Sequence, residues 1–348
     1  MVRILICSVL LYALAQACPA SSGWTVASVA PQSSKAVAAA EEQAKKLIAR
    51  RSGRYRARGH FDRSSGFGDD FRPLPITGSC AMETLFEGRL ALERSMRRFP
   101  GAPRPVENWS LFAFRPGGEV CWSVSCDSSR TPFLYLDGVA VDGELRMGDP
   151  SKKVYSLMTF GDEGRWSSKF GLQGSKRPMF VLEMSPLDME TPVELVAELK
   201  RAPLVPEHLN QKADDKDAAN NWREEHGLLA KLAGDYASRN KKVRVWARVV
   251  AQGRFLIWLT ESDGLLEEVA ITGFDGPLEK YAHWRVAASA MVPHLFTGTF
   301  EKERLVFDSF GSSGKISLDL RKEGRIKIAR RGTGGKGRVE LVREALPK

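Results

Sequence analysis

The sequence is poor in the residues that most often bind metals and perform catalysis. It has 5 cysteines and 5 histidines in 348 residues, and they form neither a C-x-x-C motif nor a cluster of cysteine with histidine. Structural zinc sites need such closely spaced ligands, because four of them must meet around one ion. We therefore predict no metal site and no other cofactor.

Catalytic motifs are also missing. Residues 311–314 lack the G-x-S-x-G spacing of a nucleophile elbow. Residues 332–337 lack the spacing and the Ser or Thr of a phosphate-binding loop, and Glu224-Glu225-His226 is not H-E-x-x-H. His283 and His294 could approach each other across strands as a ligand or base pair. We expect a protein that is not an enzyme, with an enzyme that has a non-standard site as an alternative.

Only one long apolar run occurs, and it lies at the N-terminus. Ile4–Ala17 follows the positive Arg3 and ends in an Ala-x-Ala pattern. The run is shorter than the roughly 18 residues that span a bilayer, and its layout is typical of a cleaved signal peptide. We therefore expect export to the periplasm or outside the cell. Lipid anchoring at Cys18 is an alternative, although Ala15 stands where lipoprotein signals usually have Leu.

No later apolar run is long enough to cross a bilayer, so any membrane contact is expected to be peripheral. Export to an oxidising compartment would allow disulfides. Cys121 and Cys126 lie five residues apart, and this odd spacing places them on opposite faces of a continuous strand. They are therefore not expected to pair with each other, whereas pairing of Cys80 with either one stays open.

The chain is basic, with a formal net charge of +10 and a pI near 9.4. Such a surface favours anionic partners. The sequence does not interleave basic residues with stacking aromatics, so no specific nucleic-acid partner is expected.

The densest group of arginines lies near the N-terminus. Ser33–Arg51 is rich in helix-forming residues and predicts a short helix. The sequence after it, rich in Arg, Gly and Ser, predicts a flexible linker. We expect this region to contact an anionic envelope polymer or lipid headgroups, with a solvated spacer as the alternative. The residues concerned are Arg50, Arg51, Arg54, Arg56 and Arg58.

From about residue 78 to 203 the pattern indicates β-strands. Two Asp-Gly pairs near residue 140 fit tight turns between strands. Val193–Lys200 is interpreted as the last strand of this set. Met82–Arg98 fits either strands or a helix, because its periodicity does not decide between them.

The last third of the chain has the clearest β pattern. Asp217–Leu232 predicts an amphipathic helix with Gly234 as its cap. Eight or nine short strands follow from about residue 241, alternating apolar and polar residues, which is typical of an up-and-down antiparallel barrel. In Arg254–Thr260 both faces are apolar, whereas a barrel strand with water outside should have one polar face. Either that helix or the first β region is expected to cover this strand.

Together these patterns predict a mainly β protein with two antiparallel barrel-like domains, short helices and a flexible N-terminal tether. The predicted boundaries are a signal peptide at 1–17, a helix with a basic flexible linker at 18–77, a β-rich domain at 78–203, a linker at 204–216, and a helix with a β-barrel at 217–348.

The final region resembles a known family. From residue 228 the chain reads LLAKLAGDY, then GRFL, then GFD followed by a Tyr and a Trp, and finally GTF with L-x-F. This order is similar to an uncharacterised bacterial family of exported calycin-like, or lipocalin-like, β-barrels, catalogued as a domain of unknown function, over residues 219–348. Tyr236 stands where the family often has Trp, Phe274 where it has Tyr, and Gln252 where it has Gly. The resemblance implies a barrel and export, and no reaction, ligand or functional residue.

The main functional hypothesis is a binder of a small apolar molecule or lipid in the lumen of the last domain. The same side chains could instead fill that lumen. A cavity of about 300 Å³ or more would favour ligand binding, and a filled one an interaction or scaffold protein attached to the envelope by its basic segment. The residues expected to contact the ligand are Phe255, Ile257, Trp258, Trp284 and Phe307.

Overall fold

The chain forms two compact units, each of them a β-barrel, so the predicted mainly β, antiparallel fold is confirmed. One unit comprises Met1–Ser125 with Leu134–Leu195, the other Cys126–Phe133 with Val196–Lys348. The predicted signal peptide and Cys18 lie outside the described residues. The computed structural model describes residues 34–62, 73–100, 102, 104–128, 133–141, 143–149, 153–175, 177–188, 191–206, 224–275, 278–301, 304–309, 315–319, 325–332 and 335–344.

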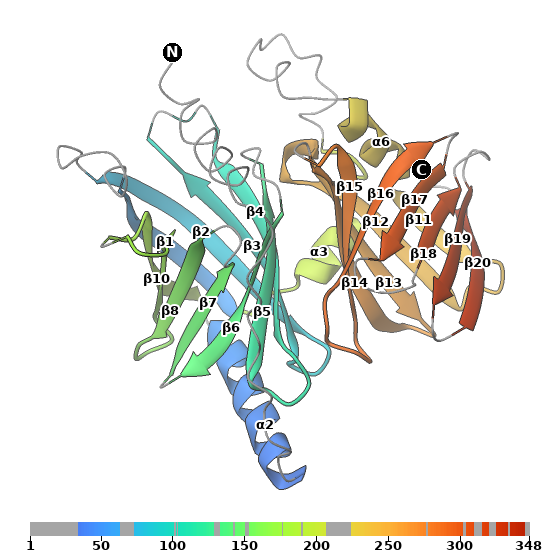
Figure 1. The fold of residues 1–348 in the computed structure, drawn as a ribbon. Helices are drawn as coiled ribbons and strands as arrows, with labels where there is room; N and C mark the ends of the chain where they lie inside the picture. The colour runs from blue at the N-terminus through green and yellow to red at the C-terminus, as the bar shows by residue number, and fades with distance from the viewer. Residues whose placement is uncertain are drawn as a thin grey trace. The chain divides into compact units, whose positions relative to one another are not determined.

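Ten antiparallel strands form the first barrel (Figure 1). Neighbours in sequence are neighbours in the barrel, and β1 closes it by pairing with both β2 and β10, which leaves no free sheet edge. The strands are β1 (Gly53–Phe61), β2 (Leu74–Leu85), β3 (Leu90–Arg98), β4 (Val106–Phe114), β5 (Val120–Asp127), β6 (Leu134–Val141), β7 (Glu144–Asp149), β8 (Val154–Phe160), β9 (Trp166–Leu172) and β10 (Phe180–Asp188).

Ten further strands form the second barrel, which β11 closes by pairing with both β12 and β20. The sequence predicted eight or nine strands, and β11 is the one it did not include. The strands are β11 (Gly234–Ser238), β12 (Val243–Val250), β13 (Phe255–Ser262), β14 (Leu265–Asp275), β15 (Lys280–Ala287), β16 (His294–Glu301), β17 (Arg304–Ser309), β18 (Lys315–Asp319), β19 (Arg325–Gly332) and β20 (Gly335–Arg343).

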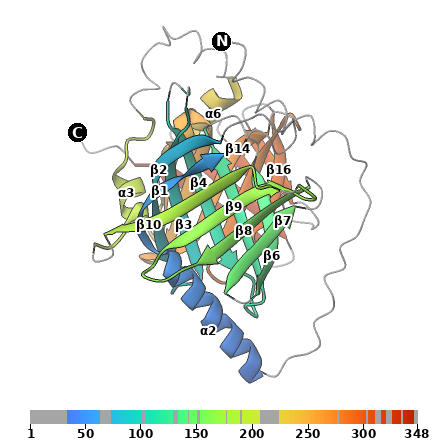
Figure 2. The same ribbon diagram turned by 90° about the vertical axis from the view of Figure 1, so that its left-hand side faces the viewer.

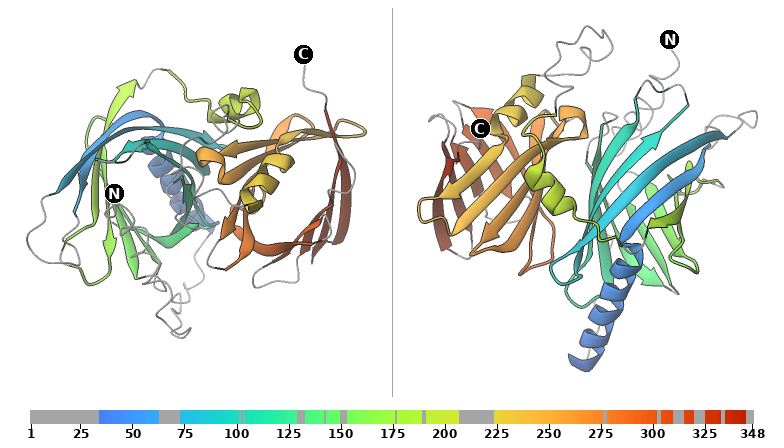
Figure 3. Two further views of the ribbon diagram at one scale, coloured as in Figure 1. Left: turned by 90° about the horizontal axis from the view of Figure 1, so that it is seen from above. Right: turned by 180° about the vertical axis from the view of Figure 1, so that it is seen from behind.

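Helix α2 (Ser34–Arg51) matches the helix predicted before the basic segment. Its C-terminal half enters one end of the first barrel, where Ala44, Leu47 and Ile48 are buried in one cluster with inward-facing strand residues. Figure 2 shows α2 projecting from this end, and the view from above in Figure 3 places it within the outline of the strands. The helix therefore covers one end of the barrel.

The turn between β4 and β5 contacts the same helix. The backbone N–H of Gly117 donates a hydrogen bond to Glu41 Oε1 at 3.0 Å. Gly118 has a φ of +73°, and a Cβ at this position would lie 2.4 Å from the carbonyl carbon of Ala40. Only glycine combines this backbone conformation with such a close approach. Gly118 therefore allows the turn to pack directly against α2.

The flexible linker predicted after the helix is wrong for Gly53–Phe61, because these residues form β1. Tyr55 and Ala57 are fully buried inside the barrel, whereas Arg56 and Arg58 are exposed outside it. The residues thus alternate as in any half-buried strand. The arginines at the outer positions give the segment the composition of a linker, and this composition hid the alternation.

Two other segments differ from the sequence interpretation. The undecided Met82–Arg98 forms a hairpin of β2 and β3, with positive φ at Phe86 and Glu87 in its turn. The strand predicted over Val193–Lys200 is wrong, since Leu195–Arg201 forms helix α3. Its Leu, Ala, Glu and Lys residues are strong helix formers. This intrinsic preference decided the conformation of a segment whose apolar residues are too few to fix a period.

Helix α6 (Glu224–Leu232) forms the last part of the predicted amphipathic helix, and residues 217–223 lie outside the described residues. Leu228, Leu229 and Leu232 join the interior cluster of the second barrel. The hydroxyl of Tyr281 donates to the Glu225 carbonyl at 3.1 Å. One end of the second barrel is therefore covered by α6.

Helix α3 covers part of the outer face of β12 and β13. Arg248, which is 2% exposed, donates to the carbonyls of Lys200 at 2.7 Å and Ala202 at 2.9 Å. The Lys200 ammonium pairs with Glu261 and lies 4.4 Å from the Trp246 ring centroid. Helix α3 therefore covers mainly β12 and reaches β13 only through Glu261. On the outer face of β13, the ring centroid of Phe255 lies 5.1 Å from that of Phe133.

Cys80, Cys121 and Cys126 are buried, and Cys80 and Cys121 are free thiols. Cys121 belongs to the interior cluster of the first barrel, and the alternation along β5 turns Cys126 to the other face, as predicted. Among the described residues, no helix combines the length and the apolar content that crossing a membrane requires.

Candidate functional site

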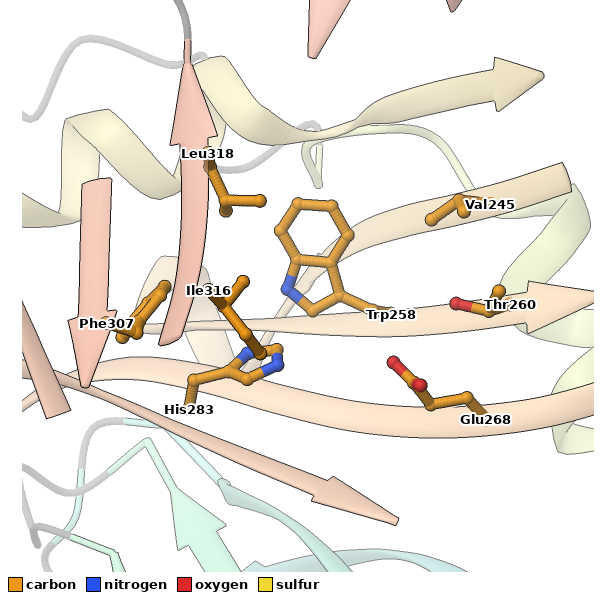
Figure 4. A pocket seen from close by; sticks show the side chains of 8 residues that line it. All are labelled: Val245, Trp258, Thr260, Glu268, His283, Phe307, Ile316 and Leu318. Atoms are coloured by element: carbon orange, nitrogen blue, oxygen red, sulfur yellow. The ribbon is translucent and has the colours of Figure 1, made fainter. Parts of the chain in front are cut away.

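Apolar side chains fill the interior of the second barrel. The buried cluster draws on α6 and on all ten strands, and its largest members are Tyr236, Trp258, Tyr281, Phe296 and Phe307. A cavity of about 30 Å³ remains (Figure 4). Its lining residues are Val245, Trp258, Thr260, Glu268, His283, Phe307, Ile316 and Leu318.

The size of this cavity limits what it can hold. A single water needs about 10–15 Å³ measured in this way, so the cavity has room for one or two waters. Pockets for small organic ligands measure roughly 300–1,000 Å³. The described interior of the second barrel is therefore filled, and it does not meet the size criterion for the ligand predicted there.

A short chain of hydrogen bonds crosses the filled interior. Trp258 Nε1 donates to Thr272 Oγ1 at 2.8 Å, and Thr272 Oγ1 lies 2.8 Å from His283 Nδ1. Because the indole N–H is only a donor, the threonine oxygen accepts from it, and the hydroxyl proton is free to go to Nδ1. Thr272 is fully buried and His283 is 7% exposed. These polar atoms satisfy one another, as a stable core requires.

Glu268 is a further polar residue of the cavity lining. Glu268 forms an ion pair with Arg285 on the neighbouring strand. In Figure 4 the Glu268 carboxylate and the Thr260 hydroxyl point into the same space as the His283 ring. His294 lies opposite Arg285 rather than opposite His283, and its pKa is lowered by burial and by Arg285. The described residues contain no group of three or more His, Cys, Asp or Glu that could hold a metal ion.

The residues predicted to contact an apolar ligand divide between the two faces of the barrel wall. Trp258 and Phe307 face the interior and line the cavity. Phe255, Ile257 and Trp284 occupy the alternate positions of β13 and β15 and face outward, although they are also buried. The sequence showed apolar residues on both faces of β13 and did not show which face was inside.

The first barrel differs because a charged side chain lies inside it. Arg51 ends α2, is 2% exposed, and its Nη2 donates to Glu93 Oε2 at 2.8 Å. Its guanidinium carbon is 4.6 Å from the ring centroid of Phe112 and 5.1 Å from that of Trp166. These rings come from β4 and β9, which stand on opposite sides of the barrel. The guanidinium therefore lies well inside, between two aromatic faces that favour a cation.

Several buried polar atoms in this interior have no hydrogen-bond partner within the described part of the chain. They include Nε and Nη1 of Arg51, Oγ of Ser95 and Nε of Arg97. Ser95 and Arg97 alternate with Met96 on β3, on the same face as Glu93. Buried polar groups are nearly always paired, and each unpaired one costs about 1–3 kcal/mol. The interior is thus short of hydrogen-bond acceptors.

Nearby titratable groups do not supply those acceptors. The Tyr55 hydroxyl donates to the Ser52 carbonyl at 3.0 Å, and burial raises the pKa of Tyr55 to about 12. Burial also raises the pKa of Cys80, which lies opposite both Tyr55 and Ser95, well above the ordinary value. Both groups are therefore neutral at neutral pH. Glu93 is left as the anionic partner of Arg51.

The other end of the first barrel is aromatic. The ring centroid of Phe180 is 4.8 Å from that of Phe61 and 6.1 Å from those of Phe99 and Phe170. All four rings, here named the Phe180 cluster, are partly exposed. Phe61 ends β1, whereas α2 precedes the start of β1, so this cluster lies at the end of the barrel away from the helix.

Apolar residues connect the two ends. They face inward from neighbouring strands between Arg51 and the Phe180 cluster, and they are Ala57, Ile76, Met82, Trp166, Leu182 and Met184. The interior therefore passes from a charged, donor-rich region under α2, along apolar walls, to a partly exposed aromatic end.

The five predicted arginines are in different environments. Arg50 donates to the Gly161 carbonyl at 3.1 Å and lies over the Phe160 ring. Arg51 is inside the barrel, so its side chain is not available to a surface partner. Arg54, Arg56 and Arg58 occupy the outward positions of β1.

Sequence reasoning missed Glu93, Ser95 and Arg97. These three residues occupy every second position of LALERSMRR, but Arg94 and Arg98 are polar as well, so the segment does not alternate cleanly. The segment had therefore not been assigned to a strand.

Comparisons with known proteins do not identify a family for this chain. No protein-family model matches the sequence, and no curated protein matches it. The chain is similar to a solved protein of unknown function from the DUF3598 family of Nostoc punctiforme, with 12% identity over 86% of this chain and 96% of that one and a TM-score of 0.23. It is also similar to isotype 1 transferrin binding protein B from serogroup B Neisseria meningitidis, with 7% identity over 84% of this chain and 76% of that one and a TM-score of 0.17. A third similar structure is kievitone hydratase from Nectria haematococca, with 8% identity over 84% of this chain and 90% of that one and a TM-score of 0.14. With TM-scores of 0.23 or less, these likenesses support no inference about this chain.

Proposed function

We propose that the protein is a non-enzymatic binding protein that takes a small, mainly apolar molecule into its first barrel. The observation that carries this proposal is the Phe180 cluster, whose partly exposed rings face the interior at the end that α2 does not cover. Small-molecule sites are concave and lined mainly by apolar and aromatic side chains. The second barrel differs in that apolar side chains fill its interior and leave a cavity of only about 30 Å³.

The apolar character of the walls favours such binding. Each buried CH₂ group of a ligand contributes about 0.8 kcal/mol. A chain of about eight carbons therefore gains roughly 6 kcal/mol before the cost of association is subtracted. The aromatic rings of the Phe180 cluster would add contact area at a low cost in side-chain entropy, because each ring has few rotatable bonds.

Tryptophan fluorescence tests this assignment, because each interior contains a tryptophan. Trp166 faces the interior of the first barrel and Trp258 that of the second. Titration with dodecanol should give a saturable change in the wild type, a similar change in Trp258→Phe, and a much smaller one in Trp166→Phe. A flat wild-type titration would contradict the proposal. So would a signal that depends on Trp258 and not on Trp166.

A second candidate function is contact with an anionic surface, and it rests on the outer face of β1. Arg56 and Arg58 are exposed there, and Arg58, Thr77 and Arg98 are in register across three neighbouring strands. Replacing Arg56 and Arg58 with Ser should weaken binding to anionic phospholipid vesicles, and added salt should weaken wild-type binding. Equal binding of variant and wild type at every salt concentration would end this idea. Substitution is the appropriate test, since deletion of β1 would remove a strand from a closed barrel.

We also infer export, on the strength of the N-terminal run from Ile4 to Ala17. N-terminal sequencing of the protein recovered from its producing cells should show a chain that begins at residue 18. A chain that retains the first residues would contradict the inference.

A further inference from the structure

We propose that the ligand of the first barrel carries one carboxylate, and that Arg51, assisted by Ser95 and Arg97, binds this group beneath α2. The inference rests on the proposed function and adds the chemical class of the ligand, a monoanionic amphiphile.

The hydrogen-bond donors of Arg51 are the first support. A guanidinium has five N–H groups. In Arg51 one nitrogen, Nη2, reaches Glu93, while Nε and Nη1 have no acceptor among the described residues. The hydroxyl of Ser95 and Nε of Arg97 are buried and unpaired on the same inner face. A carboxylate has two oxygens that accept hydrogen bonds and no donor, so it supplies what this interior lacks.

The balance of charge is the second support. Among the described residues, this interior contains the cations of Arg51 and of Arg97, whose Nε is buried, and one ion-paired buried carboxylate, Glu93. Cys80 and Tyr55 are neutral, because burial raises the pKa of each. The balance is one positive charge. A monoanion neutralises it, whereas a cationic ligand would add to a buried excess of positive charge, which is costly in a region of low dielectric constant.

The axis of the barrel is the third support. The Tyr55 hydroxyl donates to the Arg50 carbonyl in the last turn of α2, and Phe61 of the Phe180 cluster lies six residues further along β1. With a rise of about 3.3 Å per residue, this part of the strand is about 20 Å long. An elongated ligand with its charge at Arg51 would thus extend its apolar chain along the inner wall toward the aromatic end.

The experiment compares three probes of equal chain length on the full protein: dodecanoate, dodecanol and dodecylamine. Hydrogen bonds to a charged group contribute about 1.5–3 kcal/mol, so dodecanoate should bind roughly 10- to 100-fold more tightly than dodecanol, and dodecylamine should bind most weakly. In the double variant Arg51→Met/Glu93→Leu, dodecanol should still bind and the preference for the carboxylate should disappear. Both charges are removed together, so that neither is left buried alone.

Two further variants keep the test decisive if the double variant does not fold. Ser95→Ala removes an unpaired hydroxyl at little cost to folding, and it should lower the affinity for dodecanoate several-fold without affecting dodecanol. The control, Glu268→Leu/Arg285→Met, removes an ion pair from the second barrel and should leave the preference for dodecanoate intact.

The outcomes separate the two proposals. Equal affinity of the wild type for dodecanoate and dodecanol would overturn the carboxylate inference and leave the proposed function standing. A preference that survives in both first-barrel variants would also overturn the inference. Failure of all three probes to bind the wild type would overturn the proposed function and the inference together.

Discussion

The two barrels have the same number of strands and the same simple order, yet their interiors differ in how polar groups are satisfied. In the second barrel, Trp258, Thr272 and His283 hydrogen-bond to one another within an apolar filling. In the first, Arg51 is buried beside Glu93, and two of its nitrogens have no partner in the part of the chain that the structure describes. Both barrels are covered at one end by a helix, so the closing helix is not what distinguishes them.

The difference shows that a β-barrel fold alone does not identify a container. A filled core with satisfied polar groups is the expected state of a structural domain. Unpaired donors inside a barrel cost free energy of folding, and such a cost is characteristic of sites that gain the missing partner from water or a ligand. We therefore propose that the first barrel binds the ligand and that the interior of the second barrel has a structural role.

The largest effect on stability is expected from Phe307→Ala, which would enlarge the cavity in the second barrel. Phe307 is fully buried and borders the cavity of about 30 Å³. Its truncation should lower the free energy of unfolding by about 3–5 kcal/mol, because the new space joins one that already exists. Urea unfolding measures the loss, and binding of benzene should appear only in the variant. Phe300→Ala, at a residue 40% exposed, is the control and should change stability by no more than about 0.5 kcal/mol.

A smaller loss is expected from Arg51→Met alone. The substitution leaves Glu93 buried without its partner, which should cost about 3 kcal/mol. Urea unfolding of Arg51→Met/Glu93→Leu should recover most of this loss. If the double variant is as unstable as the single one, the ion pair is not the reason for the loss.

In the second barrel, Thr272→Val should cost about 1–2 kcal/mol. The substitution keeps the shape of the side chain and leaves Trp258 Nε1 and His283 Nδ1 without their shared partner. Thermal or urea unfolding measures this cost. The affinity for dodecanol should stay at the wild-type value, and a weaker affinity would show that the second barrel takes part in binding.

The smallest effect concerns pH. Burial raises the pKa of Cys121 to about 12 and that of Cys80 well above its ordinary value. The unfolded chain loses these protons above pH of about 8.5, whereas the folded chain keeps them. The free energy of unfolding should therefore fall as the pH rises, by roughly 0.5–1 kcal/mol per thiol between pH 8 and 9. Urea unfolding of Cys80→Ala should show a shallower decline, and an identical slope would contradict this explanation.

Much of the fold could be predicted from the sequence, because inward and outward residues alternate along most strands. The strand β1 was missed, since its outward arginines give it the composition of a linker. The helix α3 was missed for a different reason. Its 7 residues are too few to show a helical periodicity, and they follow a series of strands that made another strand the natural expectation. Both failures concern short segments whose conformation is decided by pairing or by intrinsic preference rather than by pattern.

The candidate site could not be predicted in the same way. Arg51 ends a helix in a basic segment, and its burial depends on the insertion of α2 into a barrel formed by residues far along the chain. Its partner Glu93 lies 42 positions away in sequence. The inner and outer faces of β13 were likewise indistinguishable, because both are apolar, and three of the five predicted ligand residues therefore face outward.

The most direct measurement is the response of the tryptophan indole N–H groups to a ligand. Protein labelled with ¹⁵N at tryptophan would be titrated with dodecanoate and followed by two-dimensional NMR. The indole N–H signal of Trp166, which lies beside Arg51, should shift in a saturable way. The indole N–H signal of Trp258, which donates a hydrogen bond to Thr272, should not change. A shift of Trp258 with an unchanged Trp166 would contradict the assignment of the ligand to the first barrel.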